Sequence, residues 1–193
     1  MSTAKVAGMR LIRRDEWGAR PPKSVVPIAH SQPESWVHHT AGEFSRPPKW
    51  TEKLFRTKAN AYVRAIQNYH MDTRNYADIA YTYMLFKMYG FRRMHVYELR
   101  GFGVQGGHTL NHNSISYGFC LAGNFDVTKL TKRDVRYIRS FFDWAHSKKA
   151  LKGRRMQHPT GGHQDTEGAS TACPGQYVME HMTEFRIPLK RRI

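Results

Sequence analysis

Apolar residues recur at intervals of three and four between Thr51 and His70, as on one face of an amphipathic helix. The segment from Leu130 to Lys149 has the same spacing and begins with Thr131 and Asp134 in the arrangement of a capping box. The pattern therefore predicts helices over 51–70 and 130–149. Their apolar faces consist of Phe55, Ala59, Tyr62, Val63, Ile66 and Tyr69 in the first, and Val135, Ile138, Phe142 and Ala145 in the second.

A third helix is expected to start at Pro174, a residue well suited to a first helical turn. It would carry Tyr177, Val178, His181, Met182 and Phe185.

Four short stretches are rich in β-branched or aromatic residues and are bounded by polar or glycine-containing segments, which is typical of strands. They read "SWVHHT", "DIAYTYMLFKM", "RMHVYELR" and "SISYGFCLAGNF". Strands interleaved with helices predict an α/β fold with a mixed central sheet and about three flanking helices. The chain of 193 residues shows no internal repeat, so one domain over 1–193 is expected.

The balance of charges narrows the choice of partner. A formal net charge of +16 favours polyanions, that is, nucleic acid, anionic lipid or an anionic cell-wall polymer, and charge alone does not choose among them. No helix-turn-helix, zinc-finger spacing or RNA-binding signature supports nucleic acid. No apolar run approaches the ~20 residues of a membrane span, so no membrane insertion is expected. The start, "MSTAKVAGMRLIRRDEW", lacks the apolar core of a secretory signal, so we expect synthesis in the cytoplasm.

The two cysteines are expected to be free thiols. Cys120 lies in the alternating apolar run "ISYGFCLAG" and reads as a buried strand residue. Cys173 is a candidate metal ligand.

A catalytic zinc takes three protein ligands and keeps a fourth position for water. His163 and Cys173, ten positions apart in "GGHQDTEGASTACPG", supply two candidates. "WVHHTAG" supplies a third, but strand alternation sends His38 and His39 to opposite faces and does not say which one enters the site. The alternative for the stretch with His163 and Cys173 is a polar loop that binds no metal. The alternative for the histidine of "WVHHTAG" is a hydrogen-bonded residue of the core.

Five stretches occur in an order that resembles the peptidoglycan recognition proteins and type-2 N-acetylmuramoyl-L-alanine amidases, including phage amidase lysozymes. They are "RRDEWGAR", "WVHHTAG", "IQNYHMDTRNYADIAYTYML", "VYELRGFGVQGGHTLNHNSISYGFCLAGNF" and "GGHQDTEGASTACPG", which together run from about Arg13 to Tyr177.

The resemblance implies zinc ligands at His38, His163 and Cys173. It also implies a catalytic Tyr81, in a "DIAY" strand where relatives usually have glycine in place of the alanine, and a Thr171 that assists the oxyanion. By strand alternation alone, Tyr83 would share the face of Tyr81.

Two further positions, His108 and Asn113, match residues that line the substrate groove in relatives, and the alternative for both is a polar turn before a strand. The chain departs from the commoner family pattern in having ten rather than eight positions from His163 to Cys173, which affects where Thr171 lies. Asp165 is more typical of a turn cap than of a metal ligand.

The resemblance implies a zinc-dependent amidase that cleaves the bond between the lactyl group of N-acetylmuramic acid and L-alanine in peptidoglycan. Together with the charge, the expected cytoplasmic synthesis suggests a monomeric phage endolysin that binds peptidoglycan and anionic wall polymers once the membrane is permeabilised. The alternatives are a cytoplasmic muropeptide-recycling amidase and a non-catalytic peptidoglycan sensor.

Overall fold

A mixed sheet forms the middle layer of the protein, seen here in a computed structural model that describes residues 8–29, 33–44, 49–148, 151 and 158–186. Strands β3 and β4 pair antiparallel, and the other neighbouring strands of the sheet pair parallel. The order across the sheet is β1 (Met9–Ile12), β4 (Met94–Glu98), β3 (Tyr83–Leu85), β5 (Ser116–Leu121), β2 (Glu34–His39) and β6 (Gly161–Gly162).

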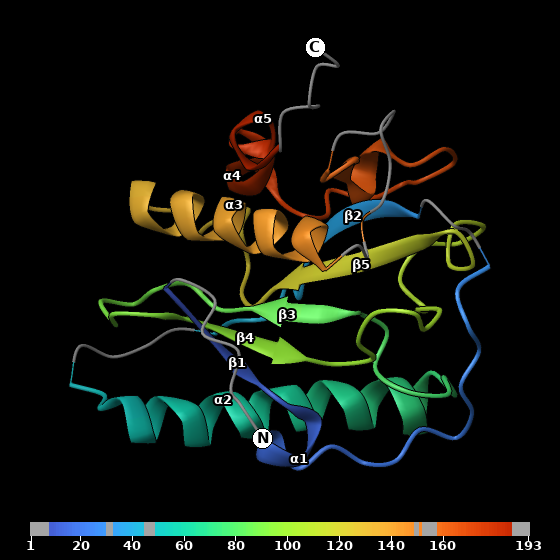
Figure 1. Ribbon diagram of the computed structural model, residues 1–193, viewed down its shortest axis with the longest axis horizontal. Coiled ribbons are helices and arrows are strands. Elements are labelled where there is room, and N and C mark those ends of the chain that lie inside the picture. The colour runs from blue at the N-terminus through green and yellow to red at the C-terminus, as the bar shows by residue number, and fades with distance from the viewer. Residues whose placement is uncertain (1–7, 30–32, 45–48, 149–150, 152–157, 187–193) are drawn as a thin grey trace.

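Helices cover both faces of this sheet (Figure 1). Helices α1 (Arg14–Trp17) and α2 (Glu52–Asn68) lie on one side. Helices α3 (Lys132–Ser147), α4 (Gln176–Met179) and α5 (Met182–Phe185) lie on the other. The predicted start of α3 is confirmed, because Thr131 and Asp134 form the capping box. The α/β fold with a mixed sheet is confirmed as well.

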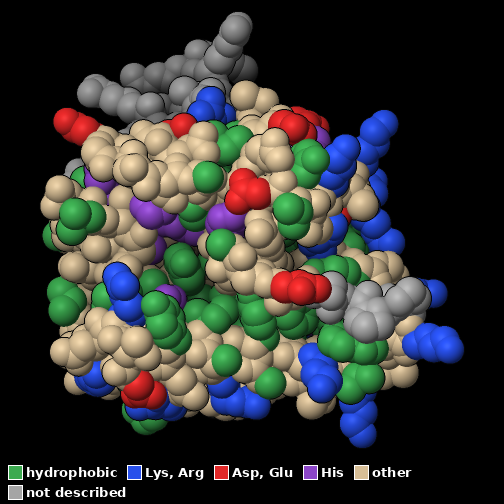
Figure 2. Space-filling view, turned by 180° about the vertical axis from the view of Figure 1, so that it is seen from behind, with side chains coloured by type: hydrophobic (Ala, Val, Ile, Leu, Met, Phe, Trp, Pro, Cys, Tyr) green, Lys and Arg blue, Asp and Glu red, His purple; other side chains and the backbone are tan. Residues whose placement is uncertain are grey.

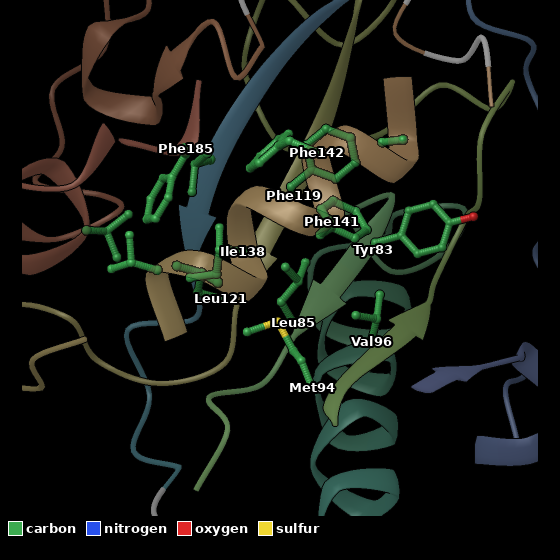
Figure 3. Packing of buried hydrophobic residues seen from close by; sticks show 14 of the residues in the cluster. Tyr83, Leu85, Met94, Val96, Phe119, Leu121, Ile138, Phe141, Phe142 and Phe185 are labelled. Atoms are coloured by element: carbon green, nitrogen blue, oxygen red, sulfur yellow. The ribbon is translucent and has the colours of Figure 1, made fainter. Parts of the chain in front are cut away.

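Two apolar layers hold the helices to the sheet. Between α3 and the sheet, Phe119 packs edge-on against Phe141 and Phe142 at ring-centroid distances of 5.2 and 5.3 Å (Figure 3). On the opposite side, fully buried Phe55 of α2 packs against Phe86. Burial of one such side chain contributes about 1.5–3 kcal/mol, so these aromatic contacts fix both helices on the sheet.

The "RRDEWGAR" stretch ties the start of the chain to the sheet. Trp17 is fully buried and donates its indole N–H to the carbonyl of Glu98 at 2.8 Å. Arg14 pairs with the buried carboxylate of Asp78 at 2.8 Å. This stretch therefore has a structural role, because it anchors the start of the chain to the sheet and to the segment before β3.

Two predicted elements are shorter than expected. The strand predicted over 78–88 is regular only at Tyr83–Leu85, because the N–H of Ala80 donates to the imidazole of His70 and the carbonyl of Ala80 accepts from Gly107. The helix expected from Pro174 is two short helices, α4 and α5, since His181 adopts φ −106° and ψ 5° between them.

Strands β1 and β6, helix α1 and a π-helical turn η1 (Tyr69–Thr73) had not been predicted. No helix of the described residues is long and apolar enough to cross a membrane. Residues 1–7 and 149, which belong to the segments used for the signal and second-helix predictions, lie outside the described residues.

Candidate metal centre

Parallel pairing brings two histidines together at one end of the sheet. Strand β6 pairs with β2, with Gly162 opposite Val37, so the next residues, His163 and His38, lie side by side. Their ring centroids are 4.6 Å apart. His39 points elsewhere, and its Nδ1 accepts the backbone N–H of Phe125 at 3.2 Å. Of the two histidines, His38 is therefore the one that lies next to His163.

Cys173 completes a group of three ligand atoms. The donor atoms of His38, His163 and Cys173 all lie within 4.8 Å of one another, and the Nδ1 of His38 is 3.7 Å from the Sγ of Cys173. A tetrahedral zinc holds a nitrogen and a sulfur ligand about 3.5 Å apart. Two imidazoles and a thiolate are also a donor set that suits zinc. The residues therefore fit this metal.

Burial keeps the two histidines in the form that binds a metal. It lowers the pKa of His38 well below the ordinary value, with His108, His163 and His39 adding to the effect, and it lowers the pKa of His163. Both imidazoles are therefore neutral at pH 7 and have a free lone pair.

Burial raises the pKa of the Cys173 thiol to about 11, although the backbone N–H of His39, 3.4 Å from Sγ, opposes that shift. Metal binding at this thiol is consequently coupled to loss of its proton.

Tyr81 lies beside this group, outside the regular strand. Its ring centroid is 5.3 Å from that of His38. Burial raises the pKa of its hydroxyl well above the ordinary value, and nearby Cys120 and Cys173 raise it further. The hydroxyl is thus protonated at neutral pH and is available as a hydrogen-bond donor.

The expectation that Tyr83 shares the face of Tyr81 is wrong. Tyr83 belongs to the apolar layer under α3, where its ring meets Phe141 at 5.8 Å, whereas Tyr81 packs on the opposite side of the sheet. Alternation fails here because the regular strand begins only at Tyr83.

His70 had not been assigned a role. It lies in the π-helical turn η1, and its ring is 5.8 Å from that of Tyr81 and stacks on Tyr76 at 5.6 Å. Burial lowers its pKa to about 4. The signal available in the sequence was its place in "IQNYHMDTRNYADIAYTYML", one of the five stretches that carry the resemblance.

The two residues predicted to line a substrate groove have partners within the protein. His108 is buried and lies against His38, with the Nδ1 of His108 3.0 Å from the Nε2 of His38. The side-chain carbonyl of Asn113 accepts the backbone N–H groups of His108 and Thr109 at 2.7 and 2.9 Å. Asn113 therefore braces the turn that holds His108, and contact of either residue with a substrate stays a prediction.

The loop between His163 and Cys173 places the remaining predicted residues. Thr171 is exposed, and its hydroxyl accepts the backbone N–H of Cys173 at 3.1 Å. The carboxylate of Asp165 accepts the N–H of Gly162 at 2.9 Å. Asp165 thus caps the short turn η2 (His163–Asp165) and is not one of the three clustered ligands.

The two cysteines are free thiols, as expected, with Cys120 buried in β5 directly opposite His38 in the neighbouring strand.

On the face of the molecule seen in Figure 2, histidine side chains gather in a hollow that also exposes hydrophobic side chains. A concave surface with imidazoles and apolar groups suits a ligand with both polar and apolar parts.

Known proteins share both the sequence and the fold, although no protein-family profile matches the chain. Peptidoglycan-recognition protein SC2 of Drosophila melanogaster is 31% identical over 175 residues, which cover 90% of this chain and 84% of that protein. Human N-acetylmuramoyl-L-alanine amidase is 30% identical over 172 residues, which cover 86% of this chain and 27% of the human protein.

Among solved structures, wild-type Drosophila PGRP-LB superposes with a TM-score of 0.73 at 24% identity, covering 89% of this chain and 91% of that one. Peptidoglycan recognition protein-LE in complex with tracheal cytotoxin, a monomeric diaminopimelic acid-type peptidoglycan, gives a TM-score of 0.72 at 26% identity, with 88% and 90% covered. From the extent of these matches, the chain belongs to the peptidoglycan recognition protein family.

Proposed function

We propose that this protein is a zinc-dependent N-acetylmuramoyl-L-alanine amidase that hydrolyses the amide between the lactyl group of N-acetylmuramic acid and the L-alanine of peptidoglycan. The observation that carries the proposal is the group formed by His38, His163 and Cys173, whose donor atoms lie within 4.8 Å of one another beside Tyr81. The similarity to a human N-acetylmuramoyl-L-alanine amidase supports the same reaction.

Each residue of the site has a distinct task in this reaction. Zinc, when bound, supplies Lewis acidity and brings the pKa of a water ligand to about 7. The protonated hydroxyl of Tyr81 donates a hydrogen bond to the amide oxygen as negative charge develops there. Thr171, exposed next to Cys173, offers a second hydroxyl without positive charge.

The charge of the protein bears on where it acts. The net charge of +16 supports binding to anionic wall polymers as well as to peptidoglycan. From the resemblance to phage amidases we propose further that the protein is a monomeric endolysin, made in a host cytoplasm, that reaches the wall after the membrane is permeabilised. A recycling amidase would prefer small soluble muropeptides to intact walls, so the preferred substrate separates the two.

The second candidate is a non-catalytic recognition protein, which is favoured by the names of relatives such as peptidoglycan recognition protein 1 of the mouse. A protein of this kind binds peptidoglycan and has no need of metal ligands. The clustered histidines and cysteine weigh against it, because three possible metal ligands, one buried and two half-buried, would have no evident role side by side in a protein that only binds.

Digestion of purified sacculi with the zinc-loaded protein and with a chelator-treated control tests the proposal. New L-alanine amino termini that depend on zinc, without new reducing sugar ends, are expected. Binding without cleavage would identify a recognition protein instead, and new reducing ends would mean that a glycosidic bond is cut.

Ligand variants connect this activity to the site. His38→Ala and Cys173→Ala should each abolish zinc retention, measured by metal analysis after dialysis, together with the release of amino termini. His39→Ala is the matched control, because His39 points away from the cluster, and it should keep the metal. Unimpaired zinc retention by either ligand variant would remove that residue from the ligand set.

A further inference from the structure

The ring of His108 lies in a narrow slot between two glycines. A Cβ atom at Gly118 would be 2.4 Å from the Cγ of His108, and one at Gly106 would be 2.5 Å from its Cδ2. Real Cβ atoms do not approach other atoms so closely, so both positions need glycine for the ring to lie there. Asn113 also accepts the backbone N–H groups of His108 and Thr109, so the loop holds this imidazole in one orientation.

The partners of His108 fix which of its nitrogens carries hydrogen. Its Nε2 faces the carbonyl oxygen of Ser116 at 3.4 Å, and a carbonyl can only accept. The hydroxyl of Ser116, 3.5 Å from the same nitrogen, already donates to the carbonyl of His112 at 2.6 Å. In neutral His108 the hydrogen therefore lies on Nε2, and Nδ1 is an acceptor that faces two groups able to donate, the hydroxyl of Thr109 at 2.9 Å and the Nε2 of His38 at 3.0 Å.

That assignment determines the hydrogen of His38 in turn. A lone pair on the Nε2 of His38 would face the lone pair on the Nδ1 of His108 at 3.0 Å, so the Nε2 of His38 carries the hydrogen and donates, sharing this acceptor with the hydroxyl of Thr109. The Nδ1 of neutral His38 then keeps its lone pair, and this is the nitrogen that lies 3.7 Å from the Sγ of Cys173.

We propose that His108 is a positioning residue for the metal ligand His38: by accepting the Nε2 hydrogen of His38, it fixes the tautomer and the orientation that turn Nδ1 of His38 toward the metal. This inference rests on the proposed zinc site. Ligating histidines commonly donate their second N–H to a carboxylate or a backbone carbonyl, and here a second histidine, itself fixed by Ser116, takes that place.

The test measures zinc affinity by competition with a fluorescent chelator, using the full chain stripped of metal. His108→Leu keeps the bulk of the ring but has no acceptor, and it should raise the zinc dissociation constant about 10- to 100-fold. In His108→Asn the amide oxygen can take the place of Nδ1, so this variant should recover most of the loss. An unchanged affinity in His108→Leu, or an equal loss in both variants, would overturn the proposal.

His112→Leu is the matched control. Its ring lies in the same loop but pairs with Glu34 at 2.8 Å, outside the chain of hydrogen bonds that ends at His38. The zinc affinity of this variant should equal that of the wild type. An equal loss here would mean that the loop as a whole, rather than the acceptor, supports the site.

A measurement on the wild type avoids any effect of substitution on folding. Long-range proton–nitrogen NMR correlations of the zinc-loaded protein report which nitrogen of His38 binds the metal, and Nδ1 is expected, with the hydrogen of His108 on Nε2. Binding through Nε2 of His38 would overturn the inference. Sacculus cleavage is scored separately, so a protein that binds zinc as described without cleaving would contradict the proposed function and leave the role of His108 intact.

Discussion

Two tyrosines that are two positions apart in the sequence lie in different surroundings. Tyr81 has its ring 5.3 Å from that of His38, while Tyr83 lies in the apolar layer with its hydroxyl 3.5 Å from a carboxylate oxygen of Glu98. They differ because the regular strand begins only at Tyr83, so strand alternation does not relate the two side chains. Proximity to the candidate ligands, and not residue type, distinguishes Tyr81 from Tyr83.

This difference predicts unequal effects of removing the two hydroxyl groups. Tyr81→Phe should lower the rate of amide cleavage about 100- to 1000-fold, because it removes one donor to the developing oxyanion, and it should leave zinc affinity unchanged. Tyr83→Phe, the control, should cleave at nearly the wild-type rate. Initial rates of amino-terminus release from sacculi measure both. Equal rates in the two variants would exclude Tyr81 from the reaction.

At the scale of elements, long periodic segments were predicted well and short ones were not. Helix α2 shows its apolar spacing over 17 residues, enough to define a face. Strand β6 has two glycines and therefore no side-chain pattern, yet its pairing with β2 is what places His163 beside His38. The choice between His38 and His39 came from the family resemblance, because alternation alone left it open.

The contacts of His70 and His108 were beyond sequence reasoning for a similar physical reason. Both side chains reach the site from irregular segments, a π-helical turn and a loop, where no period relates one residue to the next. His70 contacts Ala80 and His108 contacts Gly118, and no helix or strand period relates the members of either pair.

The capping carboxylate of α3 also ties this helix to the segment that follows β3. Buried Asp134 accepts the backbone N–H groups of Met88 and Thr131 at 2.7 and 2.8 Å. Asp134→Ala should therefore lower the free energy of unfolding by roughly 2–4 kcal/mol, since it removes a helix cap and leaves buried donors unpaired. Asp143→Ala, at an exposed position of the same helix, should change it by less than about 0.5 kcal/mol. Urea unfolding at pH 7 compares the two, and similar losses would contradict this role.

At the scale of the whole molecule, the net charge of +16 should govern how the protein finds its substrate. Attraction between a basic protein and an anionic wall is screened over about 10 Å at 0.1 M salt. Lysis of intact walls should therefore fall steeply between low and physiological ionic strength, whereas cleavage of a small soluble muropeptide should change little. A flat response with intact walls would contradict this prediction.

Buried neutral histidines should make the fold sensitive to acid. Burial lowers the pKa of His95 and of His158 to about 4, even though Glu52 acts in the opposite direction on His95. The unfolded chain, with a histidine pKa near 6.5, binds more protons than the folded one between pH 6.5 and 4. Stability should therefore decrease as pH falls through this window, by at most about 1.4 kcal/mol per pH unit for each histidine.

Urea unfolding of the metal-free protein from pH 7 to 4 measures this slope. Metal must be absent, since its loss in acid would add a separate pH dependence. His95→Phe, which keeps the ring contacts with Phe55 and Phe91, should give a shallower slope than the wild type. The exposed His146→Gln should not alter it. Equal slopes in all three proteins would contradict the prediction.

The spacing of the ligands along the chain has a consequence for the lifetime of the folded protein. His38 and Cys173 are 135 positions apart, so an ion held by both would close a large loop, much as a disulfide does. The edge strand β6, which precedes the Cys173 loop, is paired with the sheet over only two residues. Loss of the ion would therefore expose the stretch from Gly161 to Cys173 to proteases before α2 or α3 unfolds. A single bound ion would then determine both the catalytic activity of the protein and its resistance to proteolysis.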